Sequence, residues 1–301
     1  MSDASVDVLA RRFAVDGARW QDGPGGLPFL IVDGGACRAR LTPYGAHLCE
    51  WTPPGQSRSV VFLSPRSRFT AGTAIRGGVP VCFPWFAGHR SDAAKPAHGF
   101  ARTRAWDVAR IAREDEAVAA ELVLSADSDT RRHWAADFEA RLSLRLGASL
   151  EMTLTVLNRG ANAIAYEAAL HSYFAVGDVE TIAIRGLGGA RFVDKVDRLA
   201  EKVQGSGPVS VRGEIDRVFL ETSATCEVED PVFRRRVRIE KSGSLATVVW
   251  NPGPVKGPAI ADLGNDLWRH FVCVETANCG IHEVRLAPGG RHAMSARVSV
   301  V

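Results

Sequence analysis

Hydrophobic and polar residues alternate with a period of two along much of this chain. The clearest example is the stretch 138–146, where Phe, Ala and Leu alternate with Glu, Arg and Ser. A second alternating run covers 150–156, directly after the loop Gly147-Ala148-Ser149. Because successive side chains of a strand point to opposite faces, each run has one apolar face. Two such runs joined by a short glycine-containing loop predict a β-hairpin with one buried face.

Short apolar runs of this kind recur throughout the sequence, separated by Gly, Pro, Asn and Asp. We expect further strands at 29–32, 60–63, 117–124, 164–170, 236–241, 245–250, 271–275, 283–286 and 294–300. Helical periodicity is scarce, and two short helices are expected, within 127–137 and within 259–270. Many strands at this spacing predict an all-β protein built as a large antiparallel β-sandwich.

The chain has 301 residues, and no Pro- or Ser-rich linker divides it. The loop at 205–208 is too short to separate two domains, and all-β folds often reach this length as one unit. We therefore expect a single domain over residues 1–301. Residues 1–20 are expected to be loosely held, as chain termini often are.

Charge and composition restrict the possible partners. The formal net charge is +3, with 46% hydrophobic and 24% charged residues, which is ordinary for a globular protein. No basic run is interleaved with aromatic residues, so nucleic acid is not an expected partner. The run Arg234-Arg235-Arg236 is expected to lie in a solvated turn or strand edge.

The sequence carries no targeting or membrane signal that we can identify. No stretch approaches the roughly 18 apolar residues of a membrane helix, and the first residues lack the apolar core of a signal peptide. The six cysteines form no CxxC pair and no zinc-like spacing, so we expect buried, reduced thiols and no metal. We expect a cytoplasmic monomer without membrane association.

Two residues could transfer protons. His171 interrupts an apolar run at 168–174, and histidine is well suited to proton transfer near neutral pH. Glu275 follows the apolar run 271–274 and shares a strand face with Cys273. A buried carboxylate would gain a raised pKa and act as a better base. The alternatives are a core histidine with backbone partners and a strand-end glutamate in water or paired with an arginine.

Other residues suit a small anionic, hydroxyl-rich ligand. Arg76 directly precedes two glycines, and Arg102 follows the element His98-Gly99. Two guanidinium groups suit a phosphate, although lone arginines more often form surface ion pairs. His98 and Asp216 could bind sugar hydroxyls, or lie in ordinary turns. Aromatic residues at 83, 85 and 86 could line an apolar wall under a sugar ring, or simply belong to the core.

Five segments, taken together and in order, carry a resemblance to a known family. They are AIRGGVPVCFPWF (74–86), HGFAR (98–102), LHSYF (170–174), DRVF (216–219) and VCVE (272–275). They closely resemble the corresponding elements of D-hexose-6-phosphate mutarotases, also called glucose-6-phosphate 1-epimerases, which belong to the aldose 1-epimerase superfamily. The resemblance spans roughly residues 28 to 300.

This resemblance implies a galactose-mutarotase-like β-sandwich. It also implies an enzyme that interconverts the α and β anomers of a hexose 6-phosphate, such as glucose 6-phosphate, without cofactor or metal. His171 matches the catalytic acid and Glu275 the catalytic base. The residues matched to sugar-phosphate binding are Arg76, Arg102, His98 and Asp216. Two departures from the family pattern are Ala97, where glutamine is common, and Phe219, where tyrosine is common.

Three alternatives to a hexose-phosphate mutarotase are open at this point. The same fold could serve a mutarotase for free aldoses. A carbohydrate-phosphate-binding sandwich without turnover is possible, although the presence of both His171 and Glu275 argues against it. A nucleophilic role for Cys273 would need a histidine brought close by folding.

Overall fold

The longest alternating runs form one antiparallel sheet. The computed structural model describes residues 5–301. Eight strands pair in the order β13-β17-β18-β22-β9-β8-β7-β6. Their bounds are Asp107–Glu114 (β6), Ala117–Ser125 (β7), Phe138–Leu146 (β8), Leu150–Asn158 (β9), Ala183–Arg185 (β13), Cys226–Asp230 (β17), Arg235–Ser242 (β18) and Arg291–Val300 (β22). The predicted hairpin is confirmed: β8 and β9 pair antiparallel, and their side chains alternate between buried and half-buried.

A second eight-stranded sheet follows the order β15-β14-β16-β19-β20-β11-β5, with β12 also paired to β20. Its strands are Val81–Cys82 (β5), Ala168–Leu170 (β11), Tyr173–Ala175 (β12), Arg191–Asp194 (β14), Ala200–Val203 (β15), Ile215–Phe219 (β16), Ala246–Asn251 (β19) and Phe271–Asn278 (β20). We call it the site sheet, because most of the candidate residues lie on it or next to it.

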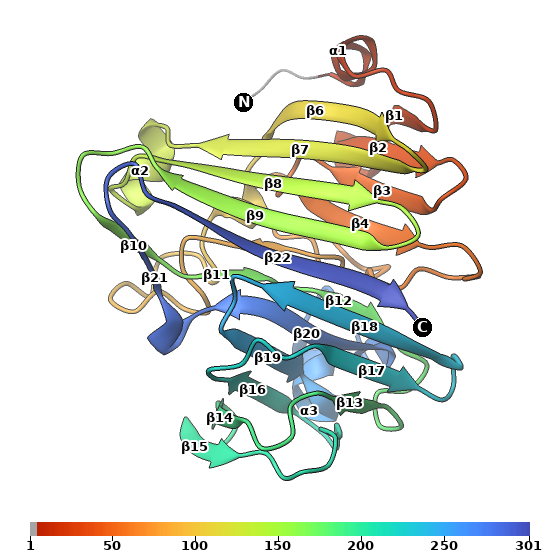
Figure 1. The fold of residues 1–301 in the computed structure, drawn as a ribbon, viewed down its shortest axis with the longest axis vertical. Coiled ribbons are helices and arrows are strands. Elements are labelled where there is room, and N and C mark those ends of the chain that lie inside the picture. Colours follow the sequence, from red (N-terminus) through yellow and green to blue (C-terminus); the bar gives the residue numbers. More distant parts are fainter. Residues whose placement is uncertain (1–4) are drawn as a thin grey trace.

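Two smaller sheets complete the structure. One has the order β1-β2-β3-β4, and the other pairs β10 with β21. Their strands are Ala18–Asp22 (β1), Pro28–Asp33 (β2), Arg38–Thr42 (β3), His47–Thr52 (β4), Ile164–Tyr166 (β10) and Val284–Leu286 (β21). In Figure 1 the first sheet runs from β6 at the top to β13 at the bottom. The β1–β4 sheet lies beside the upper strands of this first sheet, and the site sheet lies beside its lower strands.

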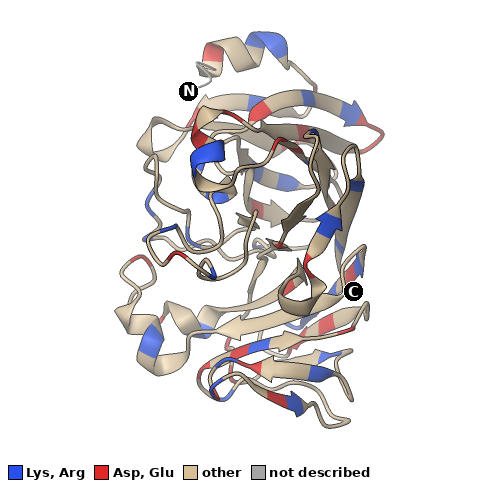
Figure 2. Ribbon diagram, turned by 90° about the vertical axis from the view of Figure 1, so that its left-hand side faces the viewer, with Lys and Arg blue, Asp and Glu red and all other residues tan. Residues whose placement is uncertain are grey.

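These layers share one apolar core, which draws buried residues from Leu9 to Val298. The indole nitrogen of Trp51 on β4 donates to the carbonyl oxygen of Gly147 in the β8–β9 loop at 3.0 Å, linking two of the sheets. The expected antiparallel β-sandwich is therefore confirmed. Charged residues of both signs are interspersed along the strands (Figure 2). None of the helices within residues 5–301 is long and apolar enough to cross a membrane.

The helical segments are short and differ in part from the expectation. The α-helices are Val6–Arg12 (α1), Ser128–His133 (α2) and Gly253–Ala259 (α3), and the 3-10 turns are Pro24–Gly26, Ala101–Thr103, Leu267–His270 and Gly280–His282. The helix within 127–137 is confirmed as α2, which starts with a capping box between Asp127 and Thr130. The short helix expected within 259–270 is only a 3-10 turn, Leu267–His270: α3 ends at Ala259, and Gly264 takes a positive φ of 80° between the two.

Three further expectations are modified by the structure. Residues 60–63 form isolated bridges and no strand. Residues 1–4 of the N-terminal segment lie outside the described part, but α1 and β1 follow, and Leu9 and Trp20 are buried, which holds this segment against the core. Arg234 and Arg236 are exposed as expected. Arg235 is instead buried and donates to the carbonyl oxygen of Ala175 at 2.7 Å. All six cysteines are free and buried, as predicted.

Gly99 is a backbone position that a larger residue should not tolerate. Its φ is +74°, and a Cβ there would lie 2.0 Å from the carbonyl oxygen of Phe83. We expect Gly99→Ala to lower the free energy of unfolding by at least about 2 kcal/mol, because left-handed strain and overpacking add. Gly207→Ala is the matched control, since Gly207 has no atom within 4 Å of that position. Denaturant unfolding measures both, and equal stability of the two variants would contradict this account.

Candidate active site

His171, in the short break between β11 and β12, lies opposite Glu275 on β20 of the site sheet. β11 and β12 share one register against β20. Continued through the two residues between β11 and β12, this register places His171 directly across from Glu275. The amide of Val274 donates to the carbonyl oxygen of Ser172 at 3.3 Å, as this register requires. Facing residues of an antiparallel pair bring their side chains together on one face, so sheet pairing alone brings imidazole and carboxylate together.

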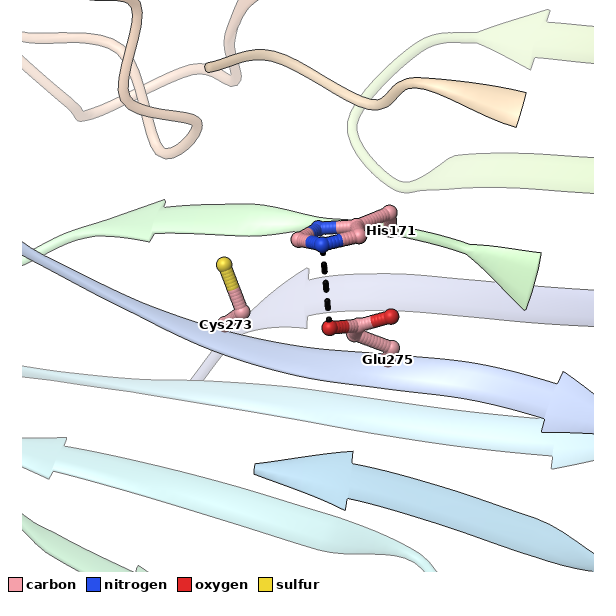
Figure 3. A group of neighbouring side chains, drawn as sticks. All are labelled: His171, Cys273 and Glu275. Atoms are coloured by element: carbon pink, nitrogen blue, oxygen red, sulfur yellow. Dashed lines mark ion pairs between the residues drawn. The ribbon is translucent and has the colours of Figure 1, made fainter. Parts of the chain in front are cut away.

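The two side chains are in contact and buried. Nε2 of His171 lies 3.3 Å from Oε1 of Glu275. The dashed line in Figure 3 marks this contact. The exposed fraction is 6% for His171 and 1% for Glu275. Among the described residues, Nδ1 of His171 and Oε2 of Glu275 have no hydrogen-bond partner. Buried polar atoms are normally paired, so these two atoms are available to a ligand.

Glu275 differs from the expectation in its place on the strand. β20 continues for three residues past it, to Asn278, and all eight residues of the strand are buried. The strand-end glutamate in water is therefore excluded. The alternative of a core histidine satisfied by backbone partners does not describe His171 either, because Nε2 faces a carboxylate and Nδ1 has no partner among the described residues.

Burial opposes charge on both groups. It raises the pKa of Glu275 well above its ordinary value, and the Asp216 carboxylate adds to the rise, whereas Lys195 and Arg102 lower it. Burial also lowers the pKa of His171, and the guanidinium of Arg102 lowers it further. Both shifts favour a neutral pair that holds one proton between the two side chains.

Aromatic rings enclose the imidazole. The ring of Tyr173 stacks on His171 at 4.9 Å between centroids, and Trp250 meets it edge-on at 6.0 Å. His98 lies in the loop between β5 and the 3-10 turn Ala101–Thr103, and its ring centroid is 5.4 Å from that of His171. Burial and the nearby cationic groups lower the pKa of His98, which favours the neutral ring. Nδ1 of His98 accepts from the amide of Ala87 at 3.3 Å, so in the neutral ring Nε2 carries the hydrogen and can donate to a ligand.

Arg76 is held beside this group by two contacts. Its Nε donates to Oδ1 of Asp262 at 3.0 Å, and its Nη1 donates to the hydroxyl of Tyr173 at 3.2 Å. Nη2 has no partner among the described residues. The backbone continues the sheet here, because the amide of Tyr173 donates to the carbonyl oxygen of Gly78 at 3.0 Å. Arg76 therefore lies next to β12, which begins two residues after His171.

Arg102 follows Gly99 and is held by the backbone of Ala97, one of the two residues that depart from the family pattern. Its Nη2 donates to the carbonyl oxygen of Ala97 at 2.8 Å, a contact that does not depend on the side chain at 97. Its Nε is buried without a partner among the described residues. The other departure, Phe219, lies fully buried with its ring 5.1 Å from that of Phe192. It is three residues from Asp216 and points to the opposite face of β16, so a hydroxyl there would not reach the site.

Asp216 lies on the same face of the site sheet as the His171–Glu275 pair. It is opposite Trp250, and Trp250 is opposite Cys273, two residues before Glu275. Facing residues share a sheet face, and so do residues two apart along one strand. Of the aromatic residues expected to line a wall, Phe86 packs on His98 at 4.9 Å, whereas Phe83 is fully buried in the core.

Cys273 adds a third donor beside the acid and the base. Ligand atoms of His171, Cys273 and Glu275 lie within 4.8 Å of one another, so folding creates a metal-ligand set that the sequence spacing did not indicate. A cation bound there would occupy both proton-transfer groups. Burial and the Glu275 carboxylate raise the pKa of the Cys273 thiol well above its usual range, so the thiol stays protonated and is a poor nucleophile.

Sequence reasoning missed three residues of the site. Asp262 and Tyr173 anchor Arg76, and Lys195 lies beside Asp216. Tyr173 lies in the segment LHSYF that carries the family resemblance, whereas Asp262 and Lys195 stand in no recognisable chemical pattern. Two surface hollows of about 310 and 410 Å³ lie elsewhere, over β2–β4 and beside β17–β18, and none of the candidate residues lines them.

Comparison with known proteins gives consistent results. The family model described as Aldose 1-epimerase matches residues 29–299. A protein of Salmonella typhimurium named "Putative glucose-6-phosphate 1-epimerase" is 35% identical over 250 residues, which cover 83% of each chain. A protein of Escherichia coli K12 with the same name is 36% identical over 251 residues, again covering 83% of each chain.

Solved structures show the same fold. The crystal structure of a "putative mutarotase" from Salmonella typhimurium superimposes with a TM-score of 0.87 and 32% identity, covering 94% of this chain and 92% of the other. A "Putative aldose 1-epimerase" from Escherichia coli K12 gives a TM-score of 0.73 at 14% identity, covering 92% and 99%. The second likeness concerns the fold alone.

Proposed function

The chain belongs to the aldose 1-epimerase family, and from this we propose that it interconverts the α and β anomers of a hexose 6-phosphate, with glucose 6-phosphate as the expected substrate. The observation that carries the proposal is the buried contact of 3.3 Å between His171 and Glu275, with Arg76 and Arg102 near enough to lower the pKa of His171. The relatives named as glucose-6-phosphate 1-epimerases support the choice of substrate.

In the proposed reaction, Glu275 accepts the proton of the anomeric hydroxyl, and His171 donates a proton to the ring oxygen. The bond between C1 and the ring oxygen breaks, and C1 becomes an aldehyde. Rotation about the C1–C2 bond exposes the other face of the aldehyde. Ring closure then returns both protons with the roles of acid and base reversed. Each positioned group supplies about 10²- to 10⁴-fold in rate.

The substrate itself favours the reactive protonation state. Without ligand, burial keeps the pair neutral. The reaction needs the opposite arrangement, with the proton on His171 and the negative charge on Glu275. A phosphate dianion bound by Arg76 and Arg102 would offset two of the cationic groups that lower the pKa of His171, and so would favour the protonated imidazole.

Phosphate binding is proposed for Arg76 and Arg102. Some N–H groups of each guanidinium already donate to the protein. Those of Arg76 donate to Asp262 and Tyr173, and one of Arg102 donates to the carbonyl oxygen of Ala97. The remaining N–H groups can bind phosphate oxygens. A charged hydrogen bond contributes about 1.5–3 kcal/mol, and this binding energy also orients the sugar against the acid and the base.

Anomer exchange measured by NMR on glucose 6-phosphate and on glucose tests the function. We expect kcat/KM to be at least about 100-fold higher for the phosphorylated sugar, from two charged contacts. Arg102→Met should reduce this preference, whereas Arg141→Met, on the opposite sheet and paired with Glu121, should keep it. Equal efficiency on both sugars would favour a mutarotase for free aldoses. No exchange on any aldose or aldose phosphate would favour a binding protein.

A further inference from the structure

Lys195 directly follows β14 and continues a row of residues that crosses the site sheet. Asp194 at the end of β14 is opposite Arg217, and the same register brings Lys195 opposite Asp216. The amide of Lys195 donates to the carbonyl oxygen of Asp216 at 2.8 Å, as this pairing requires. The row then runs from Asp216 to Trp250.

The rest of the row leads to the catalytic pair. Trp250 is opposite Cys273, and Cys273 is opposite Tyr173. Glu275 lies two residues after Cys273 on β20, and His171 lies two residues before Tyr173, in the break between β11 and β12. Residues two apart on a strand share a face, as do facing residues. Lys195 therefore belongs to the same face of the sheet as the proposed acid and base, at the end of the row away from Arg76.

The side chain of Lys195 turns toward this face. Its Nζ lies 3.8 Å from Oδ1 of Asp216 and 4.8 Å from the centroid of the Phe86 ring. Phe86 in turn packs against His98, and His98 against His171. Lys195 thus lies across Phe86 from the two histidines, and its charge reaches the base: its ammonium lowers the pKa of Glu275.

The ammonium has unused hydrogen-bonding capacity. Its distance to Asp216 is too long for a hydrogen bond, and it has no hydrogen-bond partner among the described residues. About a quarter of the side chain is exposed, as is a quarter of that of Asp216. An ammonium with three N–H donors beside a carboxylate with free lone pairs suits a group that both donates and accepts, which a sugar hydroxyl does.

We propose that Lys195 binds the substrate together with Asp216, by donating to ring hydroxyl oxygens at the end of the sugar remote from the phosphate. This inference rests on the proposed function and extends it to substrate choice. A pair that reads hydroxyl positions discriminates between hexose 6-phosphates that differ at one carbon, because an epimer leaves part of the pair without a partner. Phe86 holds the ammonium in place through its ring face.

The test compares Lys195→Met with Lys202→Met. Lys202 lies on neighbouring β15 and is paired with Asp194 and Asp197, away from the proposed site. Lys195→Met should raise KM for glucose 6-phosphate by about 10-fold, the equivalent of one charged hydrogen bond, with a smaller change in kcat. It should also alter the ratio of kcat/KM between glucose 6-phosphate and mannose 6-phosphate at least threefold. Lys195→Arg should restore both the KM and the ratio of kcat/KM in part. Lys202→Met should match the wild type in both quantities.

A second measurement separates this inference from the proposed function. The probe is 1,5-anhydroglucitol 6-phosphate, which has no anomeric hydroxyl and cannot react. Its Kd should rise about 10-fold in Lys195→Met, and Lys195→Gln is used if the Met variant does not fold. Unchanged KM, epimer ratio and Kd would overturn the role of Lys195. So would an unchanged KM with only a shifted pH profile, because that result would describe an electrostatic effect on Glu275 without contact. A wild-type protein that exchanges no sugar phosphate would instead refute the proposed function.

Discussion

Replacement of His171 by asparagine is expected to lower kcat for anomer exchange by about 10²- to 10⁴-fold, the range that a positioned proton-transfer group supplies. Asparagine keeps a polar side chain in the buried site but cannot deliver a proton to the ring oxygen. Binding of 1,5-anhydroglucitol 6-phosphate should change only slightly, because the phosphate and the outer hydroxyls are bound by other residues. Exchange kinetics by NMR and calorimetric titration with this analogue measure the two effects separately.

His270→Asn is the matched control for this experiment. His270 is an exposed histidine whose Nδ1 lies 3.1 Å from the carbonyl oxygen of Gly177, at the edge of the molecule. This variant should exchange anomers at the wild-type rate. If His171→Asn retained kcat within threefold of the wild type, the role of the imidazole as acid would be wrong, even with the fold intact.

Replacement of Glu275 by glutamine should give a loss of similar size and, in addition, a gain in stability. The loss follows because glutamine cannot accept the proton of the anomeric hydroxyl. The gain follows from burial, which raises the pKa of Glu275 in the folded state. The folded protein then holds this proton more tightly than the unfolded chain, so ionisation of Glu275 at higher pH costs folding free energy.

The pH dependence of this second effect has a definite sign. The unfolded carboxyl ionises near its ordinary pKa of about 4.3. The contribution of Glu275 to stability is fully present below that pH and is lost as pH rises toward the raised pKa of the folded state. Glu275→Gln should therefore have a higher unfolding midpoint than the wild type at pH 8, and the difference should shrink at pH 4. Denaturant unfolding at both pH values measures this, and a variant less stable than the wild type at pH 8 would contradict the assigned burial cost.

The strands that the sequence predicted well are those with a long period-two pattern. The hairpin of β8 and β9 and the apolar strand β20 were identifiable because one face, or both, is buried over their whole length. The three-residue strands β10 and β11 were predicted as one strand over 164–170, because a period of two cannot be recognised in so few residues. Their separation depends on long-range pairing, of β10 with β21 and of β11 with β20.

At the candidate site, too, some features were identifiable from the sequence and others depend on long-range strand pairing. The sequence indicated the chemistry of His171 and Glu275 by residue type and by resemblance, but only the register of the sheet shows that they touch. Lys195 was not identified because a lysine after a short strand has no distinguishing pattern. Its relation to Asp216 appears only when β14 and β16 are paired.

The pairing of β11 and β12 with β20 has a consequence for how relatives of this protein can diverge. Sheet hydrogen bonds set the separation of the two reacting side chains, and roughly a hundred residues of intervening chain play no direct part in it. Insertions in exposed turns such as the one near Gly207 add little closure entropy. Lineages can therefore remodel these turns without disturbing proton transfer.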